Sequence, residues 1–321
     1  MYLGIEIGGT KLQLAIGTGL DRQLQELVRL DIVPRGGAEG IRKQIRDFGI
    51  QLLKRHPVKG IGIGFGGPVD TKTGCTLRSF QIEGWDNWPL AAWCQAQFGL
   101  PTWLENDSNL AGLGEAHLGA GRGQAVVFYT NIGSGIGGSL ILNGAVYHGG
   151  LGTAVAEIGH LRPGPEAIAS GQTVESIASG WGIAAAGEAC LKDATDRFNP
   201  DKQMLLELCE NDPSRLTGKH LATAMADSNR LAQKIFDRAL KTYGWAIGQV
   251  ATLLAPNVIV VGGGIAQIGE ALFMAPLRQQ VEGYVIEPLR GRLSIVAAEL
   301  GEEVVLHGAL TLSRSSSQAG S

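Results

Sequence analysis

Short apolar runs that end at glycine-rich turns recur along the chain. Apolar residues dominate 2–8 and 11–17 on either side of Gly8-Gly9, a pattern that predicts a β-hairpin. The segment 125–142 repeats this strand–turn–strand arrangement, and 258–264 is an apolar run that ends in three glycines. Because glycine lets backbone amides approach a ligand without a Cβ in the way, such turns suit a polyphosphate or a nucleoside. Three of them in one chain indicate a nucleotide-handling enzyme.

The remaining segments alternate between strand and helix patterns. Apolar residues at helical spacing predict helices over 38–56, 90–98, 109–118, 269–281 and 303–312, and a mostly helical stretch over 175–255 in which 220–254 is the longest part. Further strands are predicted over 59–70, 101–105 and 293–297. This alternation favours an α/β fold with parallel strands. The echo of the first hairpin at 125–142 indicates two related α/β halves with a cleft between them.

The glycine-rich segment 119–123 is the predicted domain boundary, because it separates a helix pattern from a strand pattern. It divides the chain into an N-terminal α/β domain over 1–118 and a larger C-terminal α/β domain over 119–302. The helix predicted over 303–312 would pack back on the first domain. The low-complexity end, 313–321, is predicted to be disordered.

Composition and charge exclude several classes of protein. The 48 glycines among 321 residues are roughly twice the average usage, and they fall in turns. A formal net charge of −3 provides no general attraction to nucleic acid or to an anionic membrane. The four cysteines form no CxxC pair, and the chain has neither a signal-peptide pattern nor an apolar run of membrane-spanning length. These features predict a soluble, cytoplasmic protein.

The tripeptide Glu105-Asn106-Asp107 contains the strongest catalytic candidate. It follows the strand predicted over 101–105 and precedes the helix over 109–118, and ligands of α/β proteins bind at such carboxyl ends of strands. The Asp107 carboxylate could take the proton of a substrate hydroxyl that attacks a phosphoryl group. The alternative, on these residues alone, is that Asp107 merely caps the helix.

The order of motifs resembles the ROK family of sugar kinases and sugar-responsive repressors. The motifs are IEIGGTK, GIGIGFGGPVD, ENDSNLAGLGE, NIGSGIGGSLI, AEIGH and VIVVGGGI, and the resemblance runs from about Leu3 to Leu312. It implies an actin-like ATPase fold, of the ribonuclease H-like type, in which two α/β domains around a central cleft close over a sugar and ATP. It also implies that Asp107 is the catalytic base, which favours the catalytic interpretation over the cap.

The resemblance further implies which residues bind the ligands. The nucleotide would contact Gly8, Gly9, Thr10 and Lys11 in one phosphate loop, Gly133, Ser134, Gly135 and Gly137 in a second, and Gly262, Gly263 and Gly264 beside the adenosine. The sugar would contact Gly67, Asn106, Glu157, His160 and Glu175, since carboxylates and imidazole accept hydrogen bonds from hydroxyls. Glu6 would face Mg²⁺ through water. Taken alone, His160 would more often be a structural histidine.

The chain departs from the family in the segment after His160. Most members carry CxCGxxGCxE there, and its three cysteines join the histidine to bind structural zinc. This chain reads HLRPGPEAIASGQTVES and has no cysteine in that interval. Structural zinc takes about four N or S ligands, so we predict no zinc. The smaller departures are Glu6 for Asp, Phe65-Gly66-Gly67 for Ala-Pro-Gly, Ser134 for Thr and Ala156 for Gly.

The leading hypothesis is an ATP-dependent hexose kinase with glucose as the default substrate. Fructose, mannose, allose, N-acetylhexosamines and a polyphosphate donor stay open. A repressor is disfavoured because the first strand pattern begins at residue 2 or 3, where a DNA-binding element would be needed. A sugar-binding protein without activity is disfavoured because Asp107 and both phosphate loops are present. The resemblance implies a homodimer, Trp85, Trp88 and Trp93 are expected to pack, and His148 is expected to lie in a loop.

Overall fold

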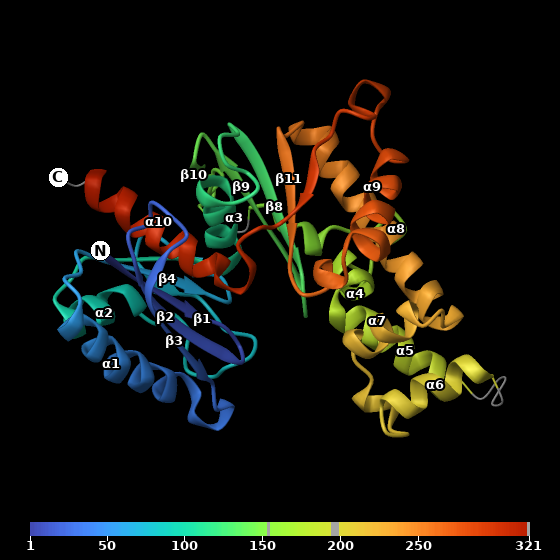
Figure 1. Cartoon of the computed structure of the whole chain (residues 1–321), viewed down its shortest axis with the longest axis horizontal. Helices are drawn as coiled ribbons and strands as arrows, with labels where there is room; N and C mark the ends of the chain where they lie inside the picture. The colour runs from blue at the N-terminus through green and yellow to red at the C-terminus, as the bar shows by residue number, and fades with distance from the viewer. Residues whose placement is uncertain (153–154, 194–198, 320–321) are drawn as a thin grey trace. The chain divides into compact units, whose positions relative to one another are not determined.

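The computed structural model describes residues 1–152, 155–193 and 199–319 (Figure 1). The chain forms two compact units. One comprises Met1–Tyr129, Ser139–Val155 and Ala298–Ser321, and the other comprises Thr130–Gly138 and Ala156–Ala297. Within the described residues, we find no helix that is both long and apolar enough to span a membrane.

The first unit contains a five-stranded sheet of order β3-β2-β1-β4-β7. Its strands are β1 (Tyr2–Ile7), β2 (Lys11–Gly17), β3 (Leu24–Asp31), β4 (Ile61–Phe65) and β7 (Thr102–Asn106). β1 pairs antiparallel with β2 and parallel with β4, and β4 pairs parallel with β7. The parallel strands therefore end at one edge of the sheet. The unit also holds a small hairpin of β5 (Val69–Asp70) and β6 (Cys75–Thr76).

Helices cover both faces of this sheet (Figure 1). They are α1 (Gly37–Arg55), α2 (Leu90–Phe98), α3 (Asp107–Leu118) and α10 (Val304–Ala319). In β4, Ile61 and Ile63 join the core cluster that includes Ile41 and Ile45 of α1. The glycines between them face α10, and a Cβ on Gly62 would stand 2.1 Å from the Ala309 carbonyl oxygen. The alternation of isoleucine and glycine thus lets α10 pack closely on one face while α1 fills the other.

The prediction that 313–321 is disordered is wrong for residues 313–319, because α10 continues to Ala319. Residues 320–321 lie outside the described part of the chain. Ser313 is fully buried and its Oγ lies 2.8 Å from where a Cβ on Gly62 would stand. Ser317 Oγ likewise lies 3.3 Å from where a Cβ on Gly60 would stand. Spaced four residues apart, these small side chains extend the buried stripe of α10 past the last leucine.

The second sheet has the order β10-β9-β8-β11-β12. Its strands are β8 (Val126–Ile132), β9 (Ile136–Leu142), β10 (Ala145–Val146), β11 (Val258–Gly262) and β12 (Ile295–Ala297). Counted in chain order, both sheets run third, second, first, fourth, fifth. The internal echo in the sequence therefore corresponds to a repeated sheet topology.

The two units do not divide at the predicted position between 118 and 119. Residues up to Tyr129 and the segment from Ser139 group with the N-terminal sheet. Gly112 of α3 explains this grouping, because a Cβ there would stand 2.0 Å from Ser139 Oγ and 3.0 Å from Tyr129 Cβ. Because α3 packs closely on these residues, β8 up to Tyr129 and β9 from Ser139 group with the first unit.

The second unit is mainly helical around its part of the second sheet. Its helices are α4 (Val174–Ala178), α5 (Gly180–Lys192), α6 (Pro200–Leu208), α7 (Gly218–Ala226), α8 (Arg230–Leu254) and α9 (Ala275–Glu282), and a π-helical turn over Glu270–Met274 precedes α9. Short 3₁₀ turns occur in the second unit at Ile158–His160, Pro213–Arg215, Ala266–Ile268 and Glu287–Leu289, and in the first unit at Pro34–Gly36 and Gly301–Glu303.

The helix predicted over 220–254 is interrupted between α7 and α8. Ser228 has a φ of +65°, in the left-handed region, which ends regular helix. Asn229 then begins the next helix by accepting a hydrogen bond from the Ala232 amide at 3.0 Å. The Asp-Ser-Asn sequence at 227–229 carries this signal, which the apolar spacing alone does not reveal.

Candidate functional site

Asp107 lies where the parallel strands of the first sheet end. It directly follows β7, and its Oδ2 stands 3.4 Å from the position of a Cβ on Gly66, which follows β4. The Gly66 amide donates to the carbonyl of Ile7, the last residue of β1, at 2.9 Å. The ends of three parallel strands thus meet around one carboxylate, which is the usual position of a ligand site in an α/β fold.

Asn106, and not Asp107, is the N-cap of α3. Its Oδ1 accepts from the amides of Ser108 at 2.9 Å and Asn109 at 3.2 Å. Its Nδ2 donates to the Gly67 carbonyl at 3.2 Å, so the structure brings these two predicted sugar contacts together. Asp107 occupies the first turn of α3, where the helix dipole favours a negative charge. The capping role that competed with catalysis is therefore filled by the preceding residue.

Glu105 and His148 form a pair that sequence reasoning missed. Glu105 is 2% exposed. Its Oε1 accepts from the Asn106 amide at 2.9 Å and from Asn109 Nδ2 at 2.8 Å, while its Oε2 lies 2.6 Å from His148 Nε2. The hydrogen bond to Glu105 raises the pKa of His148, and partial burial opposes this shift. The only signal in the sequence was a histidine beside two glycines.

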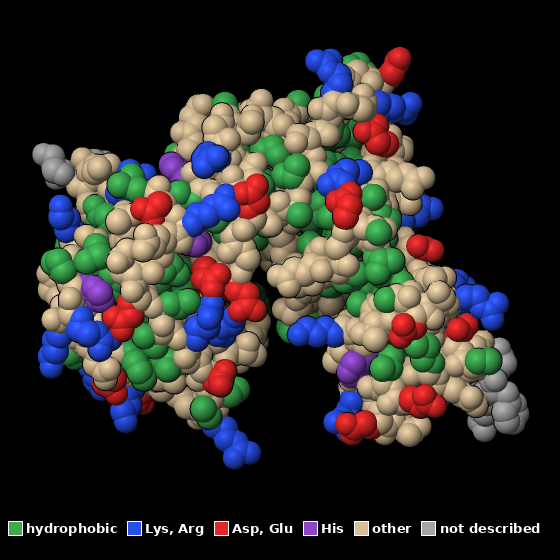
Figure 2. Space-filling model, in the orientation of Figure 1, with side chains coloured by type: hydrophobic (Ala, Val, Ile, Leu, Met, Phe, Trp, Pro, Cys, Tyr) green, Lys and Arg blue, Asp and Glu red, His purple; other side chains and the backbone are tan. Residues whose placement is uncertain are grey.

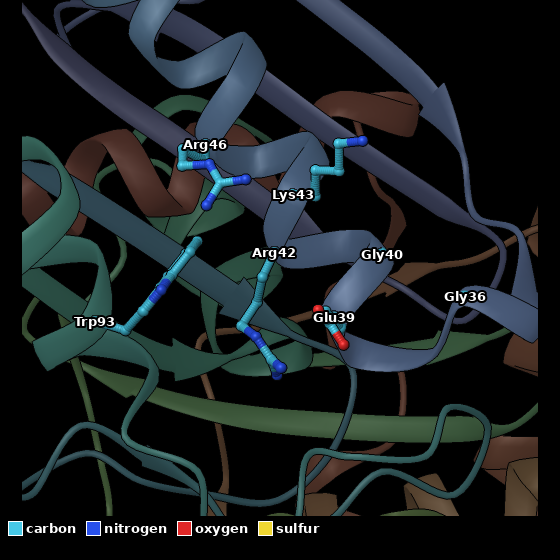
Figure 3. Close-up of a pocket in the computed structure, with 7 residues that line it drawn as sticks. All are labelled: Gly36, Glu39, Gly40, Arg42, Lys43, Arg46 and Trp93. Carbon is cyan, nitrogen blue, oxygen red and sulfur yellow. The ribbon is translucent and has the colours of Figure 1, made fainter.

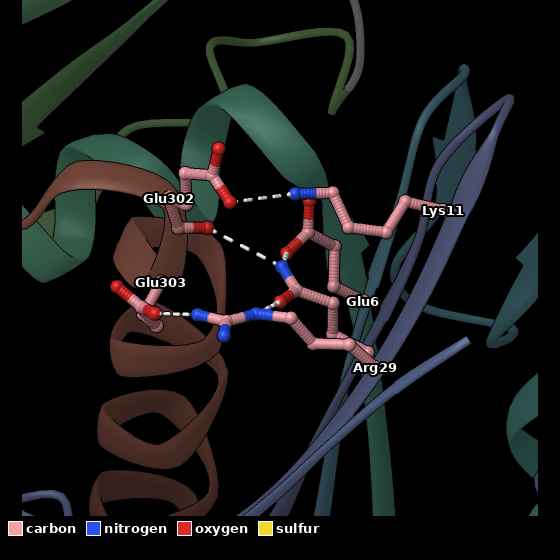
Figure 4. A network of polar contacts seen from close by, with 6 residues as sticks. Glu6, Lys11, Arg29, Glu302 and Glu303 are labelled. Carbon is pink, nitrogen blue, oxygen red and sulfur yellow. Dashed lines mark hydrogen bonds and ion pairs between the residues drawn. The ribbon is translucent and has the colours of Figure 1, made fainter. Parts of the chain in front are cut away.

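Glu6 and Lys11 belong to a polar network around the first glycine turn (Figure 4). The Gly8 amide donates to the Lys11 carbonyl at 3.0 Å and closes the hairpin, in which Gly9 and Thr10 form the tip. Gln13 Nε2 donates to Glu6 at 2.8 Å, and Lys11 Nζ lies 3.0 Å from Glu302.

Glu6 is the carboxyl group of this network whose pKa is raised. Burial raises its pKa to about 7, the Gln13 hydrogen bond opposes the shift, and the negative charge of Asp107 adds to it. Glu6 and Asp107 therefore lie within electrostatic range of each other. A divalent cation bound near both carboxylates would offset their mutual repulsion.

The second predicted phosphate loop is a tight turn in the second unit. The Gly133 amide donates to the Gly135 carbonyl at 2.9 Å, and the turn leads into β9, which carries Gly137. Glu175 lies under this turn and accepts from the Ile136 amide at 2.7 Å. A Cβ on Gly135 would stand 2.5 Å from Glu175 Oε2, so a side chain at this position would displace the Glu175 carboxylate from the turn. Glu175 thus supports the turn, a contact that the sequence did not indicate.

Glu157 precedes the 3₁₀ turn Ile158–His160 in the same unit, and His160 is the last residue of that turn. Burial raises the pKa of Glu157, His160 lowers it and the negative charge of Glu175 raises it further, so these three predicted sugar contacts lie within electrostatic range of one another. Ala156 has a φ of +62°, a left-handed conformation that suits glycine better than alanine. The departure from the family at Ala156 therefore carries backbone strain.

The third glycine turn lies beside the second. Gly263 has a φ of +91°, and a Cβ there would stand 2.4 Å from the Ile132 carbonyl oxygen. The Ile265 amide donates to that same oxygen at 3.0 Å. Gly262 ends β11 and Gly264 opens toward a cavity. The turn after β11 is thus held against the end of β8, where the second glycine turn begins.

A cavity of about 560 Å³ lies between these two turns and the helices that follow them. Its lining includes Gly133, Ser134, Gly264, Ile265, Trp181, Thr217 and Lys219. The amides of Gly180 and Trp181 donate to the carbonyls of Gly133 and Ser134 at 2.8 and 3.2 Å, so the start of α5 is joined to the second turn. Trp181 is 62% exposed. A volume of this size, with two glycine turns at one end and an indole in its wall, suits a nucleotide.

A second cavity, of about 480 Å³, lies beside α1 and α2 in the first unit (Figure 3). It is lined by α1 and α2 residues that include Arg42, Lys43, Arg46 and Trp93. The Arg42 guanidinium lies 4.3 Å from the centre of the Trp88 ring. Trp88 packs edge to face against both Trp85 and Trp93, which agrees with the packing role predicted for the three rings. None of the predicted site residues lines this cavity.

In the part of the chain that the structure describes, no group of three or more His, Cys, Asp or Glu side chains could hold a metal ion. The four cysteines are free. On the face drawn in Figure 2, basic and acidic side chains are interspersed over each unit. The predicted ligand-binding residues thus form two groups, one around Asp107 in the first unit and one around the two glycine turns in the second.

The repeated sheet topology and its glycine turns define a protein of the actin-like ATPase fold. A sequence profile described as "ROK family" matches residues 2–316, and the chain belongs to the ROK family. The glucokinase of Halalkalibacterium halodurans is 31% identical over 320 residues, a match that spans 96% of this chain and 93% of that protein. The glucokinase of Thermotoga maritima is 28% identical over 314 residues, spanning 97% and 96%.

A solved structure agrees with this assignment. The crystal structure of a ROK family glucokinase from Streptomyces griseus, in complex with glucose and AMPPNP, superposes with a TM-score of 0.81 and 29% sequence identity. The superposition covers 98% of this chain and 99% of that one. Curated and structural relatives alike are therefore similar to this chain over nearly its whole length.

Proposed function

We propose that this protein is an ATP-dependent hexose kinase in which Asp107 is the general base. The observation that carries the proposal is the position of this carboxylate at the ends of three parallel strands, while Asn106 serves as the cap of α3. A base at such a position can meet a substrate hydroxyl, and a carboxylate is the group that protein kinases use for this step. The similarity to glucokinases supports the same assignment.

The nucleotide would occupy the cavity of about 560 Å³ in the second unit. Backbone amides of its glycine turns would donate hydrogen bonds to phosphate oxygens, because N–H groups in such turns bind anions. The exposed ring of Trp181 would lie against the base, and Lys219 would add positive charge. In the first unit, the turn Gly8–Lys11 would bind the phosphates. ATP is favoured over polyphosphate because a polyphosphate has no base to fill this cavity.

Mg²⁺ would bind beside Glu6, directly or through water. The residues fit this role, since Glu6 is a partly buried carboxylate whose pKa is raised to about 7 by burial and by its neighbour Asp107. Bound Mg²⁺ would supply positive charge to the triphosphate. The residues after His160 do not fit structural zinc, because Cys75, Cys94, Cys190 and Cys209 all lie outside that segment. We therefore propose a magnesium-dependent enzyme without zinc.

The reaction would transfer one phosphoryl group and one proton. Asp107 accepts the proton of the sugar hydroxyl as its oxygen bonds to the γ-phosphorus, and the bond to the β-phosphate oxygen breaks to release ADP. Asn106, Gly67, Glu157, His160 and Glu175 would hold the other sugar hydroxyls. Orientation by these groups reduces the entropy lost in the reaction.

Glucose, phosphorylated at O6, is the proposed substrate, because the similar proteins named above are glucokinases. Kinases of fructose, mannose, allose or N-acetylhexosamines are the alternatives within the same chemistry. Release of ADP from Mg·ATP, measured against a panel of these sugars, tests the proposal. Turnover on one sugar supports it. ATP binding without turnover on any sugar would contradict it, and elemental analysis of the untagged protein would reveal zinc if the metal is bound.

A further inference from the structure

Glu105 connects the proposed base to a residue from another part of the first unit. One oxygen of its buried carboxylate accepts from the Asn106 amide at 2.9 Å and from Asn109 Nδ2 at 2.8 Å. It therefore holds both residues that flank Asp107 and Ser108. Its other oxygen lies 2.6 Å from His148 Nε2. Both carboxylate oxygens of Glu105 therefore have hydrogen-bond partners. Oε1 binds the start of α3, and Oε2 binds His148, which follows β10.

His148 follows β10 and precedes Gly149-Gly150. Its side chain is 37% exposed, whereas that of Glu105 is 3% exposed. The hydrogen bond to Glu105 raises the pKa of His148, so the imidazolium form, which can only donate to the carboxylate, is favoured over a wider range of pH. Without this donor, one oxygen of a buried carboxylate would lose its hydrogen-bond partner, which is unfavourable in a site that water does not reach.

We propose that His148 is a positioning residue for phosphoryl transfer, acting through Glu105 on the turn that carries Asp107. This inference rests on the proposed function. If the His148 hydrogen bond is removed, Glu105 can rotate toward water or another donor, and the Asn106 amide and the Asn109 side chain lose a fixed acceptor. Asp107, between them, then loses its alignment with the sugar hydroxyl. A displacement of about 1 Å in such a geometry can reduce turnover about a hundredfold.

The test compares His148→Ala and His148→Gln with a control variant of another histidine–glutamate pair in the same unit. Glutamine carries an N–H donor that can replace Nε2, and alanine carries none. The control is His56→Ala, because His56 Nε2 lies 2.8 Å from Glu26 in a pair away from the turn. The measurements are kcat, the KM for the sugar, and the hydrogen exchange of the amides of residues 106–109.

We expect His148→Ala to lower kcat about 10- to 100-fold, with the sugar KM within about threefold of wild type because the sugar-binding groups remain. His148→Gln should recover most of the loss, and His56→Ala should leave kcat unchanged. The 106–109 amides should exchange faster in His148→Ala alone. If His148→Ala does not fold, Glu105→Gln replaces it, since it keeps the volume and removes the carboxylate. Its kcat should fall by a similar factor.

The other outcomes distinguish failure of the His148 inference from failure of the proposed kinase function. A kcat of His148→Ala within twofold of wild type would overturn the inference, and so would equal losses in the alanine and glutamine variants. If wild type phosphorylates none of the sugars, the proposed function fails, and hydrogen exchange alone then tests the role of the pair. Unchanged exchange at 106–109 in His148→Ala would overturn that role in either case.

Discussion

Asp107 lies directly against Gly66: a Cβ on that glycine would stand 3.4 Å from Oδ2 of the carboxylate. The same Cβ would stand 3.3 Å from the Ile7 carbonyl oxygen, a contact that a small shift can relieve. An alanine would therefore fit the fold and cover part of the surface beside the proposed base.

Gly66→Ala should lower kcat/KM for the sugar about tenfold or more, because the added methyl displaces the hydroxyl from its position beside Asp107. The free energy of unfolding should change by less than about 1 kcal/mol. Steady-state kinetics and urea denaturation measure the two quantities. Gly40→Ala, in α1 with no atom near its Cβ position, is the matched control. Unchanged kcat/KM in Gly66→Ala would mean that the sugar approaches Asp107 from elsewhere.

Ala156→Gly should stabilise the protein, because alanine at a φ of +62° is strained. The left-handed conformation costs a non-glycine residue about 1–2 kcal/mol, and the greater freedom of glycine in the unfolded chain returns part of this. We expect a net gain of about 1 kcal/mol or less in thermal or urea denaturation. Ala255→Gly is the control, since Ala255 has a φ of +39° at the end of α8. A loss of stability in Ala156→Gly would contradict the strain at this position.

Trp181→Ala should raise the KM for ATP about tenfold, because stacking of a base on an aromatic ring contributes about 1–3 kcal/mol. The sugar KM should stay near its wild-type value. In the wild type, ADP should change the tryptophan fluorescence, and the variant should lose that change. Ile168→Ala removes another exposed apolar side chain of the same unit, one that does not line the cavity. Equal ATP affinity in wild type and Trp181→Ala would place the base elsewhere.

Glu6 should give the enzyme a pH dependence close to neutrality. Its pKa is raised from 4.5 to about 7, mainly by burial, so kcat/KM for Mg·ATP should rise with pH through about 7 as the carboxylate that would face the cation ionises. Glu6→Gln should lower kcat/KM and remove this limb from the pH profile. The same limb in the variant would assign the titration to another group.

The same shift predicts a pH-dependent effect on stability. The folded state holds the Glu6 proton more tightly than the unfolded state does, so stability falls as pH rises from 4.5 to about 7 and stays lower above that. Glu6→Gln should therefore stabilise the protein at pH 8 by about 1–3 kcal/mol and have little effect near pH 5. Denaturation curves at the two pH values measure this difference. A constant effect at both would contradict the raised pKa.

The sequence predicted the central strands of the two sheets better than strand β3 and the ends of the helices. Alternation in β1 and β4 and the three glycine turns were sufficient to predict the α/β class and the repeated hairpin. The strand β3 and the break between α7 and α8 were not predicted, because their signals are short polar sequences whose outcome depends on tertiary packing. The helical end of α10 was missed for a related reason: Ser313 and Ser317 read as low complexity, yet they fit against the glycines of the sheet.

The candidate site was predictable where one motif holds neighbouring residues. Asn106, Asp107 and the glycine turns follow directly from their segments. His148 could not be found in this way, because its partner Glu105 is 43 residues away and only folding brings them together. The support that Glu175 gives to Gly135 was hidden for the same reason. Long-range polar contacts of this kind leave no local pattern in a single sequence.

The most direct test of the central claim is the turnover of Asp107→Asn with Mg·ATP and the preferred sugar, beside a measurement of sugar binding. The amide keeps the size of the side chain and loses the ability to take a proton. We predict a kcat lower by about 10²–10⁴ with a sugar Kd near that of wild type. A kcat close to that of wild type would contradict the assignment of Asp107 as the base.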